Sequence, residues 1–436
     1  MSKLELRAVR LRTALAALVA FGTIATPPMG YADEVLDWNR IACRAVTTAP
    51  ATPPPLAARI LAMVHAAMFD AHNGIERRFE AIHVGADDAE PEPGASRRVA
   101  VVHAAFAVLL AEYPAQAEAL TVDWIKSLAA ITGRGQEENQ SIQRGMAWGQ
   151  YVADQIRAWR AVDGVFPLVS YPGSLATGEW RPTPPAFAPG FGITLGQAVP
   201  FIIPTTSTFR PAGPPPLHSV EYANDVNEVK RVGEAVTTER TADQTQSARF
   251  WAGTAPTFWN RTAVAAAEQC ETSLSENARL FALMNMAIAD TVFTTWESKY
   301  HYLLWRPIHA ITLASTDDND LTIEQPGWTP FLATPAYPEY TSGHQSISGA
   351  AATVLTAYFG NGIPVTGTSE GLPGITRSWP NFESAADEAF MARIWAGIHF
   401  RFAMRDTRQC ARQIAAYVLQ NAAQPLKGQH MGQVGE

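Results

Sequence analysis

Cysteine is scarce in this chain: only Cys43, Cys270 and Cys410 occur among 436 residues. Three is an odd number, and no pair of them has the close spacing of a metal site. Two arrangements remain open, namely one disulfide with a free thiol, or three buried thiols. The cysteines therefore point to no particular chemistry.

The chain also has no excess of positive charge. It carries 33 Lys and Arg residues against 41 Asp and Glu residues, a formal net charge of −8. This balance argues against a nucleic-acid binder. With 47% hydrophobic and 17% charged residues, the composition supplies a large core and excludes disordered and collagen-like chains.

Long hydrophobic runs are missing too. The longest, from Thr13 to Ala25, has about 13 residues, short of the roughly 20 that span a bilayer. Basic residues precede it, and Gly30 and Ala32 are small residues at the −3 and −1 positions of a cleavage site. We therefore expect residues 1–32 to be a secretory signal peptide cleaved near Ala32. The mature protein would be secreted or periplasmic, with no stable membrane span.

Strand alternation of useful length and internal repeats of 20 to 50 residues are likewise absent. Helical periodicity is common instead, so the predicted fold class is all-α, with helical bundles joined by long Pro- and Gly-rich connections. The helices are predicted at about residues 56–73, 97–112, 114–131, 136–159, 219–232, 242–253, 273–304, 346–359, 385–398 and 406–421.

One connection, residues 163–216, is crowded with Pro and Gly. It is too long for an ordinary loop and is therefore either functional or a wrap over the surface. We expect it to divide an N-terminal helical region, residues 33–216, from a catalytic helical bundle, residues 217–436.

Three short segments contain the groups needed to hold a tetrahedral oxyanion. They are K-x6-R-P at residues 299–307, T-S-G-H at 341–344 and A-R-x5-H at 392–399. Together they supply three cations, a hydroxyl, an unobstructed backbone N–H and two imidazoles, from Lys299, Arg306, Arg393, Ser342, Gly343, His344 and His399. This set indicates phosphate-like chemistry.

The spacing within the segments predicts their geometry. Lys299 and Arg306 are seven residues apart, on one face if both lie in a helix, while Pro307 biases Arg306 toward a helix end. Ser342 falls near the N-cap of the next helix, whose positive end would face an anion. Arg393 and His399 lie about 120° apart on an ideal helix, so Arg393 must reach around or the chain must loosen at Gly397.

The three segments resemble the K-x6-RP, PSGH and SR-x5-H-x3-D signature shared by vanadium-dependent haloperoxidases and type 2 phosphatidic acid phosphatases. Further stretches are similar to the bacterial haloperoxidase branch: residues 38–40, 57–73, 249–252 and 277–299. The resemblance covers most of the mature chain and implies a haloperoxidase and acid-phosphatase-like helical fold.

The resemblance also implies a role for each residue. Vanadate would be the cofactor, with its equatorial oxygens bound by Lys299, Arg306, Ser342, Gly343 and Arg393. His399 would be the axial vanadium ligand, and His344 the acid/base at the opposite apex. Trp296 would lie beside the cofactor, and Tyr337 occupies the position where family members place Phe or His near the halide.

The chain departs from the signature at three positions. Thr341 and Ala392 replace the usual Pro and Ser, at places that need not donate charge. Ala403 replaces an Asp whose carboxylate would orient the imidazole of His399. Asp406 is the nearest acidic residue in sequence that could substitute for it.

Three functions remain open at the level of sequence. A haloperoxidase would use hydrogen peroxide and halide at vanadate, with Lys299 polarising the peroxide. A secreted acid phosphatase would use His399 as the phosphoryl-accepting nucleophile of a phosphate ester, with His344 protonating the leaving oxygen. An inactive homologue would only bind phosphate. The long helical N-terminal half and the export signal favour the haloperoxidase, while halide preference, organic acceptor and oligomeric state stay open.

Overall fold

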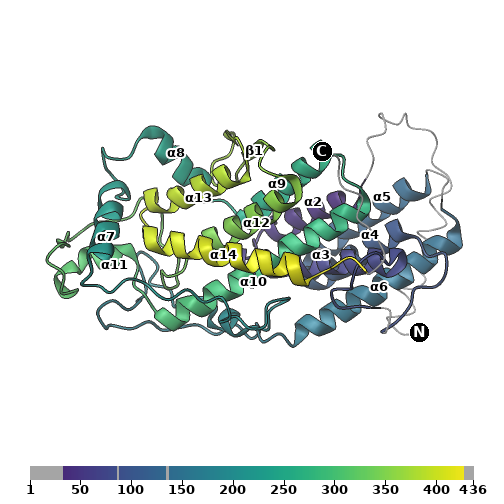
Figure 1. Ribbon diagram of the computed structural model, residues 1–436, viewed down its shortest axis with the longest axis horizontal. Helices are drawn as coiled ribbons and strands as arrows, with labels where there is room; N and C mark the ends of the chain where they lie inside the picture. The colour runs from purple at the N-terminus through teal and green to yellow at the C-terminus, as the bar shows by residue number, and fades with distance from the viewer. Residues whose placement is uncertain (1–32, 86–87, 134–136, 427–436) are drawn as a thin grey trace.

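Helices form almost all of the regular structure in this computed structural model, which describes residues 33–85, 88–133 and 137–426 (Figure 1). The all-α prediction is confirmed, whereas the predicted signal peptide lies outside the described residues. The helices are α2 (Glu34–Thr47), α3 (Pro54–Glu76), α4 (Arg97–Glu112), α5 (Ala117–Thr132), α6 (Asn139–Ala161), α7 (Val220–Val232), α8 (Ala242–Phe250), α9 (Ala255–Gln269), α10 (Leu274–Tyr302), α11 (Pro307–Thr312), α12 (Gly343–Phe359), α13 (Phe382–Trp395) and α14 (Arg401–Asn421).

Some of these elements were missed by the sequence patterns. Helices α2, α9 and α11 correspond to no predicted range, and a short antiparallel hairpin pairs β1 (Val365–Thr368) with β2 (Thr376–Trp379). Strands of four residues and a helix of six are too short to show a clear hydrophobic period.

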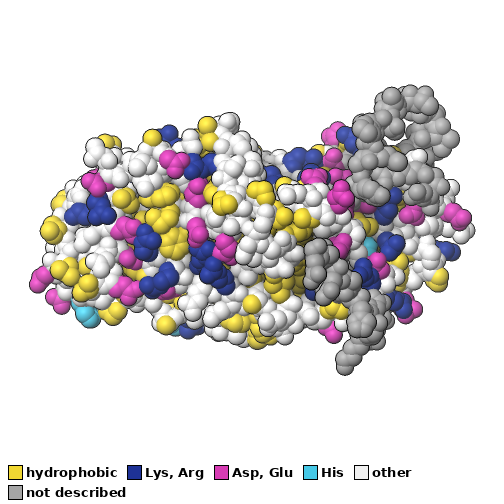
Figure 2. All heavy atoms as spheres, turned by 45° about the horizontal axis from the view of Figure 1, so that its top comes forward, with side chains coloured by type: hydrophobic (Ala, Val, Ile, Leu, Met, Phe, Trp, Pro, Cys, Tyr) yellow, Lys and Arg dark blue, Asp and Glu magenta, His cyan; other side chains and the backbone are white. Residues whose placement is uncertain are grey.

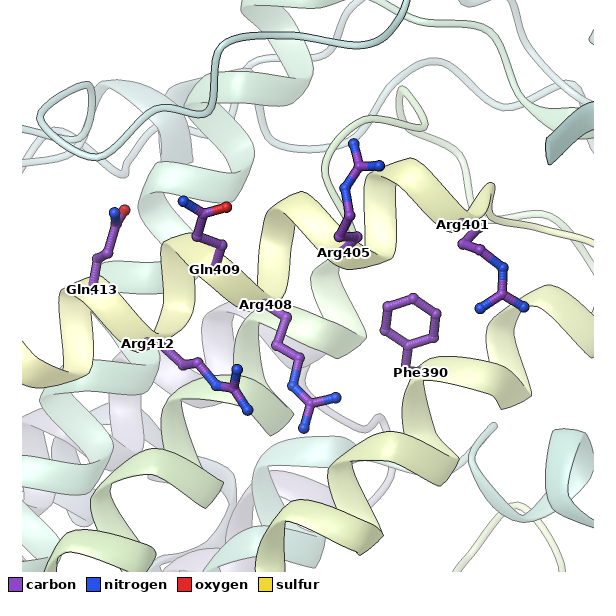
Figure 3. Close-up of a pocket in the computed structure, with 7 residues that line it drawn as sticks. All are labelled: Phe390, Arg401, Arg405, Arg408, Gln409, Arg412 and Gln413. Carbon is purple, nitrogen blue, oxygen red and sulfur yellow. The ribbon is translucent and has the colours of Figure 1, made fainter. Parts of the chain in front are cut away.

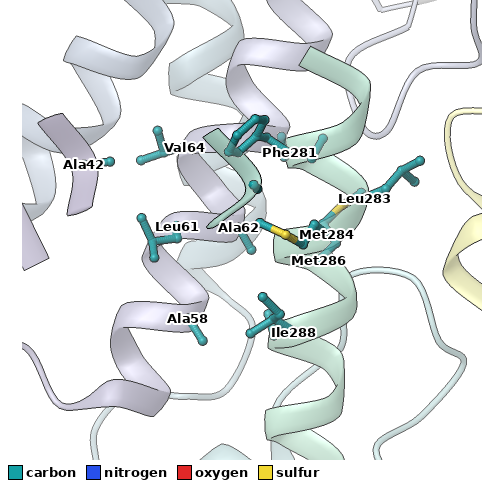
Figure 4. Packing of buried hydrophobic residues seen from close by; sticks show 14 of the residues in the cluster. Ala42, Ala58, Leu61, Ala62, Val64, Phe281, Leu283, Met284, Met286 and Ile288 are labelled. Carbon is teal, nitrogen blue, oxygen red and sulfur yellow. The ribbon is translucent and has the colours of Figure 1, made fainter. Parts of the chain in front are cut away.

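Helix α10 runs through the middle of the molecule (Figure 1). A capping box between Ser273 and Glu276 starts it, and apolar side chains then surround it on all sides, as expected for a helix in a core. On one side it packs against α3, where His65 stacks on Phe281 and where Ala58 and Ala62 lie on the same face of the helix as His65 (Figure 4). On the other side it packs against α12 and α14.

The hydrophobic core is continuous across residue 216. A single cluster contains Val64 and Val102 from the N-terminal region together with Met284, Val354 and Ile414 from the C-terminal one. The residues before and after position 216 therefore share one hydrophobic core, with no break in the packing between the two expected regions.

The two helix pairs on either side of this core repeat one another in sequence. Helix α2 contains Trp38-Asn39-Arg40 and α9 contains Trp259-Asn260-Arg261. Helix α3 then has A-R-x2-A-x4-A-x2-D over residues 58–70, and α10 has the same pattern over residues 278–290.

The hydrogen bonds repeat as well. Asn39 pairs with His65 Nε2 at 2.9 Å, and Asn260 pairs with Asn285 at 2.9 Å. Asp70 accepts from the backbone N–H groups of residues 82–84, and Asp290 accepts from those of residues 201–203. The α2–α3 and α9–α10 pairs are thus two versions of one structural unit, packed together along α3 and α10.

The long connection, residues 163–216, wraps over α10. Its Phe191 carbonyl accepts hydrogen bonds from Trp296 Nε1 at 3.1 Å and from the Tyr300 hydroxyl at 2.6 Å. Its Phe191 N–H donates to Ala336 O at 2.8 Å. The connection therefore holds the C-terminal half of α10 against the 330–340 loop.

Two further findings concern the open questions of composition. All three cysteines are free thiols, with Cys43 and Cys410 buried and Cys270 exposed. Among the described residues, no single helix combines the length and apolarity needed to cross a membrane; only the bent pair Arg97–Glu112 and Pro114–Thr132 reaches them together.

Candidate active site

The predicted oxyanion residues lie where several helices begin or end. Lys299 is in the last turn of α10, Arg306 is the N-cap of α11 and Ser342 is the N-cap of α12. Arg393 is in the last turn of α13, and His399 lies in the turn before α14. Each of these five side chains is buried, with at most 4% exposed.

Lys299 and Arg306 converge through a break in the helix and not along one helix face. Helix α10 stops at Tyr302, where Leu303 takes a left-handed conformation (φ 52°), and Arg306 is extended (φ −82°, ψ 157°) before Pro307. The prediction that the two cations share a helix face is therefore wrong. Lys299 Nζ donates to the carbonyls of Pro338, Glu339 and Thr341, so it also holds the loop that leads into α12.

The two arginines keep unused donors. Arg306 donates from Nε to Tyr337 O and from Nη1 to Ile398 O, both at 2.8 Å, while its buried Nη2 has no partner among the described residues. Arg393 donates from Nη1 to Trp251 O at 3.2 Å, and its buried Nε has none. Leaving a buried N–H group without an acceptor destabilises the folded protein. These donors are therefore suited to forming hydrogen bonds with an anion.

A glycine turn brings His399 out of the helical register. Gly397 N–H donates to Ile394 O and Ile398 N–H to Arg393 O, the pattern of a Schellman motif, with Gly397 at φ 79°. The loosening expected at Gly397 is present. A Cβ there would lie 2.2 Å from Gly233 O, so the close approach of this backbone also requires glycine.

The carboxylate that contacts His399 is Glu339. Its Oε1 accepts from His399 Nδ1 at 2.8 Å and from Phe400 N–H at 2.9 Å. The sequence suggested Asp406 for this role, and that suggestion is wrong. Asp406 instead accepts hydrogen bonds from the Tyr340 hydroxyl at 2.9 Å and from Arg405. Sequence reasoning missed Glu339, whose one signal was an acidic residue three positions before Ser342.

The electrostatics of the site favour a bound anion. Burial and the three nearby cations hold the pKa of His399 well below its usual range, so its imidazole is neutral. Burial raises the pKa of Glu339 to about 7, and burial with the neighbouring Arg306 lowers that of Lys299. Three cationic groups thus lie near His399, and two of them, Arg306 and Lys299, also lie near the buried carboxyl group of Glu339.

His344 lies next to this group of charges. Burial and the neighbouring Arg393 lower its pKa, and it hydrogen-bonds the backbone at Gly253 and Trp251. Its Nε2 is buried without a partner among the described residues. Its imidazole is also among the neighbouring groups that lower the pKa of His399, so the two rings are near each other.

Trp296 and Tyr337 form one wall of the site. Their ring centroids are 5.1 Å apart, and Lys299 Nζ lies 4.9 Å from the centre of the Tyr337 ring. A Cβ added at Gly343 would be 3.4 Å from Trp296, so glycine leaves the backbone N–H at the start of α12 unobstructed. His344 and Tyr337 are the partly exposed members and mark the open side.

These groups fit a tetrahedral oxyanion such as vanadate or phosphate. Unpartnered guanidinium N–H groups, the N-terminus of α12 and the Ser342 hydroxyl supply donors, and His399 supplies one neutral nitrogen. In the described part of the chain, no group of three His, Cys, Asp or Glu side chains could hold a metal cation.

A surface groove along α14 offers a second cationic patch (Figure 3). It has a volume of about 620 Å³ and is lined by Phe390, Arg401, Arg405, Arg408, Gln409, Arg412 and Gln413. Each of its arginines is paired with a carboxylate. On the face drawn in Figure 2, Lys and Arg side chains are interspersed with Asp and Glu side chains. The arginines of the groove therefore leave no uncompensated charge for a ligand.

Comparisons with known proteins find relatives in sequence and in fold. The family model of the VCPO second helical-bundle domain matches residues 279–428, the part that contains all three motifs. The vanadium chloroperoxidase of Curvularia inaequalis is 25% identical over 506 residues, covering 87% of this chain and 82% of that protein.

Solved structures show the same fold. The first bacterial vanadium-dependent iodoperoxidase superposes with a TM-score of 0.76 at 25% identity, covering 93% of this chain and all of that one. A bacterial vanadium-dependent chloroperoxidase in its holo form superposes with a TM-score of 0.68 at 16% identity, covering 88% and 96%. The motif-bearing bundle thus matches the VCPO family model, and the chain as a whole is similar to vanadium-dependent haloperoxidases in sequence and fold.

Proposed function

We propose that this protein binds vanadate and uses hydrogen peroxide to oxidise halide to hypohalous acid, which then halogenates organic acceptors. The observation that carries this proposal is the arrangement around His399. Three buried cationic side chains lie near its neutral imidazole, and two of them, Arg306 and Arg393, each have a buried nitrogen with no partner among the described residues.

Each residue would have a defined task. Lys299, Arg306 and Arg393 would neutralise the oxyanion, helped by Ser342 and the N–H of Gly343 at the start of α12. His399 Nε2 would be the protein ligand to vanadium. When bound, vanadate activates peroxide toward attack by halide.

His344 would move protons at this site. Its Nε2 is neutral, buried and without a partner in the described part of the chain, so it can take a proton from hydrogen peroxide and return it to a departing oxygen. Its contacts to the backbone at Gly253 and Trp251 hold the ring in place.

The proposal includes export from the cell. Residues 1–32 would act as a signal peptide removed near Ala32, placing the enzyme in a secreted or periplasmic compartment. N-terminal sequencing of the protein purified from culture medium or periplasm tests this, and an N-terminus at Met1 would contradict it.

Activity assays after orthovanadate loading test the catalytic proposal. We expect peroxide-dependent halogenation of an organic acceptor with iodide, the most easily oxidised of the three common halides, and we would compare bromide and chloride in parallel. The same preparation would be assayed for hydrolysis of p-nitrophenyl phosphate.

Two results would replace the proposal. Phosphatase activity inhibited by vanadate, without halide oxidation between about pH 4 and pH 8, would make His399 a phosphoryl-accepting nucleophile. Phosphate binding without either activity would identify an inactive binding protein.

A further inference from the structure

The hydrogen bonds of His399 define its tautomer. Arg306 Nη1 lies 3.3 Å from His399 Nε2, and a guanidinium group can only donate. Nε2 must therefore be the nitrogen with the lone pair. The proton of the neutral ring then lies on Nδ1, which donates to Glu339 Oε1.

Glu339 is held rigidly for this contact. Its N–H donates to Leu304 O at 2.9 Å, and its carbonyl accepts from Lys299 Nζ at 3.1 Å. Its side chain is fully buried and receives a second hydrogen bond from Phe400 N–H, next to His399 itself. One carboxylate oxygen therefore fixes both the ring and the backbone that carries it.

The other acidic candidates do not take this position. Ala403, where the family signature has an Asp, is fully buried and brings no polar side-chain atom. Asp406 is engaged by Tyr340 and Arg405. In the described chain, the carboxylate that contacts His399 comes from the loop before α12 and not from α14.

We propose that Glu339 is the positioning residue of His399: it replaces the missing carboxylate of α14, holds the proton on Nδ1 and directs the Nε2 lone pair toward the oxyanion site. This inference rests on the proposed function for its consequence, which is tight vanadate binding. The geometry itself depends only on the protein's own side chains and backbone.

The tautomer is measured by long-range ¹H–¹⁵N NMR on protein labelled at histidine, without vanadate, with His399→Ala used for assignment. We expect a fixed Nδ1–H tautomer in the wild type and its loss in Glu339→Ala. In Glu339→Gln the amide oxygen still accepts, so the tautomer persists while the Nδ1 proton resonance moves upfield. This isosteric variant keeps the experiment decisive if Glu339→Ala does not fold.

Orthovanadate affinity, measured by calorimetry, gives the functional consequence. Loss of a carboxylate behind a histidine ligand typically costs 10- to 100-fold in metal affinity, so we expect at least about a tenfold loss in both Glu339 variants. Asp406→Asn is the matched control, because Asp406 is a partly buried carboxylate on α14 that bonds to Tyr340 and Arg405 and not to His399. This substitution should change the orthovanadate affinity less than about twofold.

An unchanged tautomer in Glu339→Ala, or an unchanged Nδ1 proton resonance in Glu339→Gln, would overturn the proposal. These NMR results do not depend on catalysis. If the wild type binds vanadate but oxidises no halide, the proposed function fails while Glu339 keeps its role.

Discussion

At the scale of single residues, the central feature of this protein is positive charge buried without matching negative charge. Arg306 and Arg393 are at most 4% exposed, and each has a buried nitrogen with no partner among the described residues. Burying such N–H groups costs free energy unless an acceptor forms hydrogen bonds with them. An anion that the protein's own side chains do not supply would satisfy these donors.

The first prediction concerns these arginines. Arg306→Ala or Arg393→Ala should weaken orthovanadate binding by about 2 to 3 kcal/mol, roughly 30- to 150-fold, because a charged hydrogen-bond donor is lost. Calorimetry measures the change. The matched control is Arg412→Ala, which removes an exposed arginine already paired with Glu383 and should leave the affinity unchanged.

The second prediction separates the two histidines. His399→Ala should abolish vanadium binding, because it removes the proposed protein ligand to vanadium. His344→Ala should keep bound vanadium and lose turnover, since His344 acts on protons. Metal analysis after gel filtration and a halogenation assay measure the two effects, and equal vanadium loss in both variants would contradict the assigned roles.

At the scale of elements, helix ends position the chemistry. The turn after α13 releases His399 from the helix, and Gly397 makes that turn at φ 79° against the backbone of Gly233. Helix periodicity alone placed Arg393 and His399 on different faces, and the Schellman turn removes that constraint.

The third prediction tests this turn. Gly397→Ala should destabilise the protein by well over about 2 kcal/mol, because a Cβ would collide with Gly233 O in addition to the cost of positive φ. Gly374→Ala is the control: its φ of 82° is similar, but nothing lies within 4 Å of the added Cβ. Urea unfolding should show a cost of about 1 to 2 kcal/mol for the control, and equal losses would rule out the close contact.

The fourth prediction uses the repeat between α3 and α10. Burial lowers the pKa of His65 to about 3, below the ordinary value of 6.5, so the unfolded chain binds more protons between these values. Stability from this group is present above pH 6.5 and is lost as the pH falls, by about 3 kcal/mol at pH 4.

Replacing His65 with the residue at the matching position of α10 should remove this loss. His65→Asn can still donate to Asn39, as Asn285 does to Asn260, and it does not titrate. Thermal melts at pH 7.5 and pH 4 should differ less for His65→Asn than for the wild type. An identical pH dependence in both proteins would count against a buried neutral His65.

At the scale of the whole molecule, α3 and α10 join the N-terminal region to the catalytic bundle through one core. The connection of residues 163–216 adds to this by holding Trp296 and Tyr300 through Phe191. The N-terminal region therefore supports the site indirectly, by fixing the helix that carries Lys299.

The fifth prediction follows from this shared core. Separate fragments of residues 33–216 and 217–426 should show no cooperative thermal transition, because each exposes a large apolar face of α3 or α10. The intact chain should unfold in one transition, with coincident circular dichroism and tryptophan fluorescence. Independent cooperative melting of both fragments would show that the two regions are separable.

The sequence alone determined the helical class and most of the helix ranges, and it predicted the oxyanion residues that the structure brings together at the helix ends. Helical periodicity, caps and motif spacing are local properties, so they are visible along the chain. The N-cap position of Ser342 and the end of regular helix near Arg306 followed in the same way from neighbouring residues.

The tertiary structure decided which groups meet. Glu339 and His399 are 60 residues apart, and their contact depends on the break after α10, the loop before α12 and the turn after α13. Sequence proximity suggested Asp406 instead, because distance along the chain says nothing of where helix ends converge. The carboxylate behind the histidine is set by long-range packing, which no local pattern encodes.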